Sequence, residues 1–246
     1  MRIPILRGLI DRRILVNFRV DADVLSGFLP PPFRPQLVAE GIGMAGICLI
    51  RLKGIRPRWL PSFLGIGSEN AAHRIAVEWD DRGTTRTGVY IPRRDSSSYL
   101  NRLAGGRLFP GVHFHSRFAV HESAEEFRIE MANRDGTRIL VEGRIAGQLP
   151  GDSIFGDLSR ASDFFSRGSL GYSATGRAGE YDGLELHTLQ WDVRPLSIRR
   201  VESSFFADRS LFPPGTVHFD CALLMRHIPH EWHGVETLTC CVTANR

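Results

Sequence analysis

Lysine is almost absent from this chain of 246 residues, which contains 30 arginines and one lysine, Lys53. Lysine forms Schiff bases with carbonyl compounds, whereas arginine stays protonated in proteins and cannot form that imine. Lys53 follows Arg51 by two residues, and a neighbouring cation is one of the conditions that activate a lysine. The alternative is that Lys53 is an ordinary surface lysine without a catalytic role. Schiff-base chemistry therefore has a single candidate residue in the chain.

Disulfide-type cysteine spacing and long apolar runs are also absent. The four cysteines, at positions 48, 221, 240 and 241, do not form the spaced pairs of a disulfide framework, which favours a reducing compartment. The first eleven residues are interrupted by Pro4 and Arg7 and are too short for a signal peptide. No run approaches the roughly 18 apolar residues that a membrane helix needs. We therefore expect a cytoplasmic protein without a membrane partner.

The excess of positive charge is small and dispersed. The net charge is +4, and the 31 basic residues are scattered among 27 acidic ones, never more than two in a row. Such mixing is typical of a solvated surface and argues against a nucleic-acid partner. Nucleic-acid binding through arginine remains an alternative, and it would show as a strong loss of affinity with salt.

Motifs for metals, nucleotides and serine hydrolases are missing. His230 and His233 lie three residues apart just after Pro229, whereas the zincin motif needs histidines four apart on a helix. The glycines at 65 and 67 lack a P-loop lysine, and there is no G-x-S-x-G elbow. We expect no metal and no cofactor, with a composite metal site that includes His113 and His115 as the alternative.

Period-two alternation dominates the pattern and predicts a mainly β protein of the α+β class. Turn signals such as Asp80-Asp81-Arg82-Gly83 separate the expected strands. Short helices are expected at 22–28, 97–104 and 157–167, with Asp21 and Ser96 as caps of the first two. No repeat or linker interrupts the chain, so we expect one domain, 1–246, built on an antiparallel sheet that curls or closes. The expected strands are 13–20, 42–53, 72–79, 84–91, 111–120, 125–133, 137–147, 184–193 and 216–225.

Two of these strands carry polar residues on one face. In 111–120, His113, His115 and Arg117 share a face opposite apolar residues, and this face either lines a lumen or meets solvent. In 72–79, Arg74 and Glu78 share a face opposite His73 and Trp79. Glu78 beside arginines either forms a structural ion pair or, in a pocket, serves as an acid or base.

Several stretches resemble known families. The run 14–33, the segment Gly88-Val-Tyr-Ile-Pro-Arg-Arg94 and the run 192–204 resemble the acetoacetate decarboxylase superfamily. Over nearly its whole length the chain is similar to the YqjF-like family of bacterial proteins, for which 68–74 and 104–111 are recognisable. The resemblance implies an acetoacetate decarboxylase-like, closed or half-closed antiparallel β-barrel with a few short helices, a site in its lumen, and assembly into homo-oligomers.

The same resemblance places Tyr90 at the family's tyrosine, and Arg93 and Arg94 at its paired lysines, one of which forms the Schiff base. We therefore expect a barrel that binds a small organic acid or carbonyl compound, with Arg93 or Arg94 as carboxylate clamp. The alternative is that Arg93 pairs with Asp95 or Glu78 and only fixes the turn between the strand and the following helix.

Further residues complete the expected site. Tyr90, Arg74 and Arg117 are added as substrate-binding candidates. If the protein is an enzyme, the candidates for proton transfer are Glu78, Glu202, His113 and His115. A non-catalytic ligand-binding or oligomeric scaffold protein is the alternative function.

Overall fold

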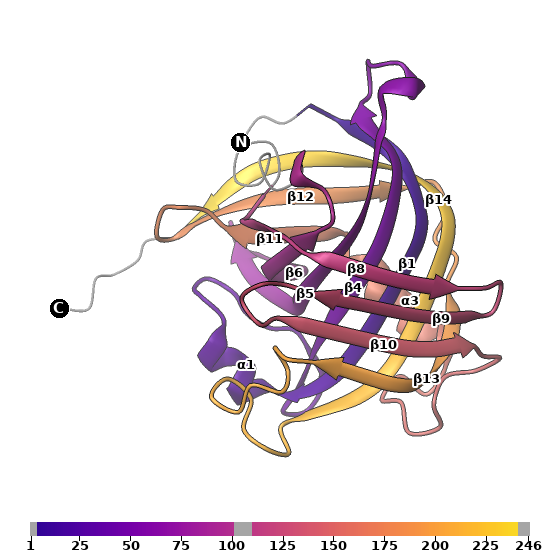
Figure 1. Ribbon diagram of the computed structural model, residues 1–246. Helices are drawn as coiled ribbons and strands as arrows, with labels where there is room; N and C mark the ends of the chain where they lie inside the picture. Colours follow the sequence, from indigo (N-terminus) through magenta and orange to yellow (C-terminus); the bar gives the residue numbers. More distant parts are fainter. Residues whose placement is uncertain (1–3, 101–109, 241–246) are drawn as a thin grey trace.

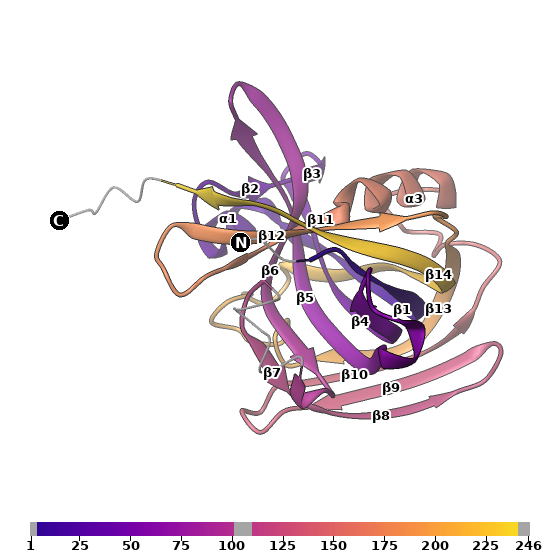
Figure 2. The same cartoon turned by 90° about the horizontal axis from the view of Figure 1, so that it is seen from above.

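Strands dominate the computed structural model, which describes residues 4–100 and 110–240 (Figure 1). Viewed from above, a β8–β9–β10 layer lies on one side of the central strands, and β11, β12 and helix α3 lie on the other (Figure 2). The elements are β1 (Leu6–Asp21), α1 (Ala22–Phe28), β2 (Arg34–Pro35), β3 (Leu37–Ala39), β4 (Ile42–Pro57), η1 (Ser62–Leu64), β5 (Ile66–Asp81), β6 (Thr84–Ser96), β7 (His113–His115), β8 (Arg117–Glu122), β9 (Glu126–Ala132), β10 (Arg138–Ile145), α3 (Leu158–Ser166), η2 (Arg167–Ser169), β11 (Leu170–Ala174), β12 (Glu180–Thr188), β13 (Arg194–Ser203) and β14 (Val217–Thr239).

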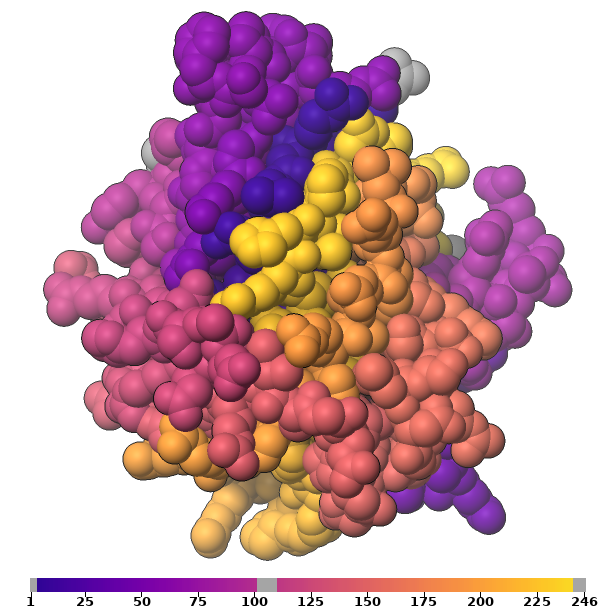
Figure 3. All heavy atoms as spheres, turned by 90° about the vertical axis from the view of Figure 1, so that its right-hand side faces the viewer, coloured from indigo at the N-terminus to yellow at the C-terminus, as the bar shows by residue number. Residues whose placement is uncertain are grey.

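Seven strands form a closed circuit. Their pairings run β1–β4–β5–β6–β11–β12–β14. Strand β14 then pairs with β1 along almost the whole length of β1, so that the two strands lie side by side (Figure 3). All these pairings are antiparallel except the short parallel one between β6 and β11. Closure removes free strand edges and encloses a lumen. The predicted closed or half-closed barrel is confirmed.

A second, open arm of the sheet branches from β14. The N-terminal half of this 23-residue strand pairs with β13, and its C-terminal half pairs with β12. From β13 the sheet continues through β10, β9 and β8, which cross in front of β1, β4 and β5 (Figure 1). A hydrophobic core that includes Ile14, Leu49, Ile129 and Val141 fills the space between this arm and the central strands.

The central strands are therefore buried on both faces. On β1, Ile14 and Val16 belong to the core under the open arm, whereas Leu15 belongs to a second core on the opposite face. That second core contains Leu223 of β14 and Phe165 of helix α3. Because successive side chains of a strand point to opposite faces, neighbouring residues of β1, β4 and β5 enter different interiors.

Most expected strands are present, with differences where the chain changes partner. The strand expected at 111–120 is two strands, since β7 pairs with β6 whereas β8 pairs with β9. The expected 184–193 corresponds to β12 at Glu180–Thr188, and 216–225 is the first part of the much longer β14. Strand β11 was missed by the alternation pattern, because its burial is nearly continuous.

Two of the three expected helices lie within the described residues. Helix α1 matches 22–28, but the Asp21 side chain makes no capping hydrogen bond. Helix α3 begins after Asp157, whose side chain accepts a hydrogen bond from the Arg160 backbone N–H. The helix expected at 97–104 extends into residues 101–109, which lie outside the described residues. Among residues 4–100 and 110–240, no helix has the length and apolarity needed to span a bilayer.

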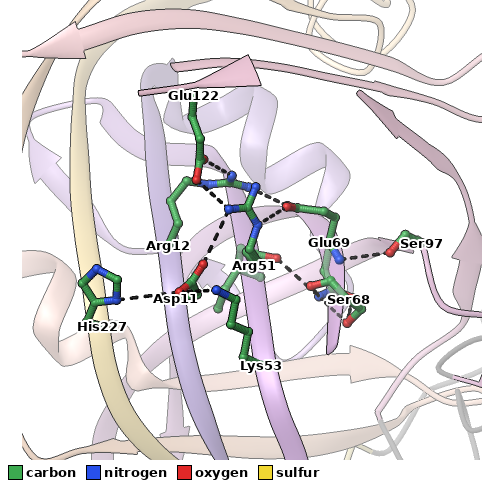
Figure 4. A network of polar contacts seen from close by, with 11 residues as sticks. Asp11, Arg12, Arg51, Lys53, Ser68, Glu69, Ser97, Glu122 and His227 are labelled. Carbon is green, nitrogen blue, oxygen red and sulfur yellow. Dashed lines mark hydrogen bonds and ion pairs between the residues drawn. The ribbon is translucent and has the colours of Figure 1, made fainter. Parts of the chain in front are cut away.

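A network of ion pairs connects the edge strand β8 to the central strands (Figure 4). The Arg12 guanidinium, only 1% exposed, contacts both Glu69 of β5 and Glu122 of β8 at 2.5 Å. Arg51 of β4 contacts the same two carboxylates at 2.5 Å. Lys53, the single lysine, donates to Asp11 at 2.9 Å and is largely exposed. The network lies on the face of β1 that bears Ile14, opposite the lumen.

We expect Arg12→Met to lower the free energy of unfolding by about 3 kcal/mol or more, because it leaves two partly buried carboxylates with one fewer cation. Arg7→Met is the matched control on the same strand. Arg7 is 49% exposed and, within residues 4–100 and 110–240, its ion pair is with Glu231, so its loss is expected to cost less than about 1 kcal/mol. Urea denaturation of both variants measures the difference. Equal costs would contradict the role given to the network.

Candidate functional site

A cavity of about 150 Å³ lies inside the closed circuit of strands. Each of the seven strands of the circuit contributes to its lining, as do His113 of β7 and the η2 turn. We call this cavity the lumen. Much of its wall is apolar and includes Ile50, Leu52, Val89 and Leu186. The polar and charged groups of the lining are thus set against an apolar background.

A β-bulge in strand β6 decides which of two adjacent arginines enters the lumen. Ile75 of β5 pairs with Tyr90, and His73 pairs with Arg93, so β6 has one residue more than β5 in this interval. A bulge of this kind reverses the facing of the side chains that follow it. Val89 and Ile91 line the lumen before the bulge, and Arg94 lines it afterwards.

Arg93, in contrast, is fully paired on the opposite face. Its Nε and Nη2 donate to the two carboxylate oxygens of Asp95 at 2.8 and 2.9 Å, and its Nη1 donates to Asp135 at 2.7 Å. The guanidinium also lies 4.1 Å from the ring centre of Phe114. Arg93 is absent from the lumen lining, and its contacts are those of a structural ion pair with Asp95.

Arg94 has a polar partner but no carboxylate partner among the described residues. Its Nε donates to the hydroxyl of Ser173 at 3.3 Å, and no ion pair with a described residue is present. Burial lowers the pKa of Arg94 to about 10, so the guanidinium remains charged at neutral pH. The lumen thus contains a cation whose charge no described side chain neutralises.

Two more arginines line the lumen. Arg74 of β5 is 7% exposed, donates through Nη2 to the Asn17 side-chain oxygen, and lies 5.1 Å from the ring centre of Phe165. Burial lowers the pKa of Arg74 to about 10. Arg13 of β1 lies 5.8 Å from the ring centre of Trp191. Neither guanidinium forms an ion pair within the described part of the chain, and each has a buried Nε without an acceptor there.

Among the described residues, His113 is the one histidine that lines the lumen. Burial, and then the charge of Arg94, lower the pKa of His113 to about 3. A hydrogen bond to the Pro110 backbone acts in the opposite direction. The imidazole is therefore neutral at physiological pH and acts as a hydrogen-bonding group rather than as a cation.

The other expected site residues lie elsewhere. Glu78 accepts a hydrogen bond from Arg34 at 2.7 Å, and the exposed Glu202 accepts one from Arg200 at 2.7 Å. Tyr90 belongs to the core under the open arm. None of these three lines the lumen.

The remaining two, His115 and Arg117, also lie outside the lumen. The His115 ring stacks on Tyr99 with centroids 3.6 Å apart, and Arg117 is exposed on β8. The structure thus brings together Arg74, Arg94 and His113 from the expected set, and it adds Arg13 and Cys48. Within the described residues, no three His, Cys, Asp or Glu side chains gather as metal ligands would.

A family model for DUF2071, described as an uncharacterised conserved protein, matches residues 10–222. The chain belongs to this family. None of the curated protein sequences matches it.

Solved structures with a similar fold include acetoacetate decarboxylase and related enzymes. The acetoacetate decarboxylase of Legionella pneumophila has a TM-score of 0.62 at 10% identity, with 96% of this chain and 88% of that chain covered. An acetoacetate decarboxylase-like enzyme from Sphingomonas wittichii RW1 gives 0.59 at 12% identity, with 96% and 92% covered. The enduracididine biosynthesis enzyme MppR, complexed with pyruvate, gives 0.61 at 11% identity, with 97% and 91% covered. At these identities the likeness establishes the fold of the DUF2071 chain.

Buried histidines predict how stability depends on pH. Burial is the main cause that lowers the pKa of His73 to about 4, of His113 to about 3 and of His230 to about 4, from an ordinary 6.5. Between pH 6.5 and 5 the unfolded chain binds protons that the folded chain does not. We therefore expect the free energy of unfolding to fall on acidification, by up to about 1.4 kcal/mol per pH unit for each histidine.

His113→Gln tests the contribution of one histidine. Urea denaturation between pH 7 and 5 should show a shallower fall for His113→Gln than for the wild type. His121→Gln, at an exposed position, is the control and should keep the wild-type slope. An unchanged slope in His113→Gln would show that His113 is not held neutral in the folded protein.

Proposed function

We propose that the lumen binds a small organic acid and that Arg94 holds the carboxylate of this ligand. The observation that carries the proposal is the Arg94 guanidinium, which lines the lumen without a carboxylate partner among the described residues. A partly buried charge without a counter-charge is costly, whereas a guanidinium and a carboxylate form a strong bidentate pair. A bound acid would remove that cost.

The size and polarity of the lumen also support a small organic ligand. A cavity near 150 Å³ is about the size that accepts a benzene-sized molecule. Its walls combine apolar side chains with a few polar groups, the usual composition of a small-molecule site. MppR, which shares the fold, has a solved structure in complex with pyruvate, a small keto acid. The ligand class proposed here agrees in size and charge with that compound.

The residues in the lumen argue against decarboxylation through a Schiff base. By resemblance, Arg93 and Arg94 stand where acetoacetate decarboxylases carry paired lysines, and arginine does not form an imine. Lys53 lies on the opposite side of the sheet in the ion-pair network (Figure 4). His113, with a pKa of about 3, is a weak base at neutral pH, but it can hydrogen-bond a ligand carbonyl or carboxylate.

Binding without turnover is the second candidate function. The described residues that line the lumen are mostly apolar, and Asp95, the acidic one, is already engaged by Arg93. The lumen thus offers few groups poised for proton transfer at neutral pH. Incubation of the protein with the best-bound acid, followed by NMR of the mixture, separates the two candidates, because an enzyme would convert the acid and a binding protein would not.

Arg94→Gln is expected to weaken binding of small carboxylates by about tenfold or more, because the variant loses a charge-assisted hydrogen bond. Isothermal titration with a panel of carboxylates and keto acids measures the loss. Arg93→Gln is the matched control. It should lower stability, because it breaks the pairs with Asp95 and Asp135, and should change affinity less than Arg94→Gln does. Equal affinity losses would contradict the assignment of Arg94 as the carboxylate anchor.

Cys48 reports whether a ligand occupies the lumen itself. It lines the lumen and is 9% exposed, so a thiol reagent has to reach it through that space. In a Cys240→Ser, Cys241→Ser background, we expect the best-bound acid to slow alkylation of Cys48 by iodoacetamide, followed by mass spectrometry. Cys221 is fully buried, and burial raises its pKa, so it should stay unmodified. An unchanged alkylation rate at saturating acid would place the ligand outside the lumen.

A further inference from the structure

Three arginines from three strands converge on the same lumen. Arg13 comes from β1, Arg74 from β5 and Arg94 from β6. None of them forms an ion pair with any residue in 4–100 or 110–240. Asp95 also borders the lumen, but both of its carboxylate oxygens accept hydrogen bonds from Arg93. One monocarboxylate at Arg94 would therefore leave two cations of the lumen uncompensated.

The strand register places the three arginines beside successive positions along β5, which we call levels. Arg74 pairs with Gly46. Arg94 pairs with Ala72, which pairs with Cys48. Arg13 pairs with Ile50, which pairs with Asn70. Neighbouring levels are two residues apart along β5, or roughly 7 Å. Side chains as long as arginine can span part of this distance, so the cationic region extends along the lumen and is not a single point.

Buried donors without acceptors lie at both ends of this cationic region. The Nε atoms of Arg13 and Arg74 are buried and have no hydrogen-bond partner among the described residues. Arg74 itself is more than nine-tenths buried and borders the lumen. A buried donor that lacks an acceptor costs free energy, and almost all such groups in proteins are satisfied. Each of these two donors thus lacks a hydrogen-bond acceptor that a carboxylate bound at Arg94 alone does not supply.

We propose that the ligand of the lumen is a small dicarboxylate, with one carboxylate on Arg94 and the second on Arg74 or Arg13. This inference rests on the proposed function, since it assumes that the lumen binds an organic acid. The apolar wall between the arginines, including Cys48 and Ala72, matches the methylene chain of such a compound. The lumen volume of about 150 Å³ limits the ligand to a few carbon atoms between the two acid groups.

Isothermal titration with two matched series tests the proposal. The dicarboxylates are succinate, glutarate and adipate, and the monocarboxylates with the same numbers of carbon atoms are butyrate, valerate and hexanoate. The wild-type protein should bind the best dicarboxylate about tenfold or more tightly than its monocarboxylate counterpart, because a second charge-assisted pair forms. The preferred chain length then reports the separation of the two cationic groups.

Variants identify the second anchor. Arg74→Gln or Arg13→Gln should reduce the ratio of dicarboxylate to monocarboxylate affinity towards one, whereas Arg19→Gln, outside the lumen, should keep the wild-type ratio. Circular dichroism and thermal melting check that the variants fold. If Arg74→Gln does not fold, the affinity ratio of the wild type and that of Arg13→Gln still test the dicarboxylate proposal.

Each failure has a separate meaning. Equal affinities of the two wild-type series would overturn the dicarboxylate assignment and leave the proposed function intact. Inorganic phosphate that binds as tightly as the best dicarboxylate would also overturn it, because a single compact anion would then suffice. Absence of binding by every acid would overturn the proposed function as well.

Discussion

The architecture depends on the pairing of β1 with β14, which joins strands from the two ends of the chain and closes the circuit of seven. Closure buries both faces of β1, β4 and β5, one against the open arm and the other against the lumen. Alternation along these strands then separates adjacent polar residues. Arg12 enters the ion-pair network and Arg13 the lumen, while His73 packs against Phe205 and Arg74 enters the lumen.

The same separation applies to Arg93 and Arg94, which lie on opposite faces of β6. The bulge at Ile91–Pro92 sends Arg93 to Asp95 and Asp135 and Arg94 into the lumen. One arginine of the pair thus stabilises the fold, and the other is left without a carboxylate partner among the described residues. A lumen with cations and apolar walls suits a small anionic ligand. Arginine does not form the imine of a Schiff-base mechanism, which agrees with the carboxylate-binding role that we propose for Arg94.

Much of the fold was predictable from the sequence, but the site was only partly so. Alternation correctly assigned Arg74 to the face opposite His73 and Trp79, and resemblance identified the barrel. Neither alternation nor resemblance could show which of Arg93 and Arg94 enters the lumen. A bulge changes the face on which the following side chains lie without changing their spacing in the sequence. Strand 13–20 contained the signal for Arg13, which shares a face with Leu15 and lies opposite Ile14. His115 and Arg117 were expected to share a site with His113, but the chain changes partner at Ser116.

A crystal structure of the protein with its best-bound acid tests the central claim most directly. We expect electron density for the acid inside the circuit of strands, with a carboxylate at hydrogen-bonding distance, about 2.7–2.9 Å, from the Arg94 guanidinium. Arg93 should keep its pairs with Asp95 and Asp135. An acid bound elsewhere, or an Arg94 guanidinium paired with a carboxylate of the protein itself, would contradict the account.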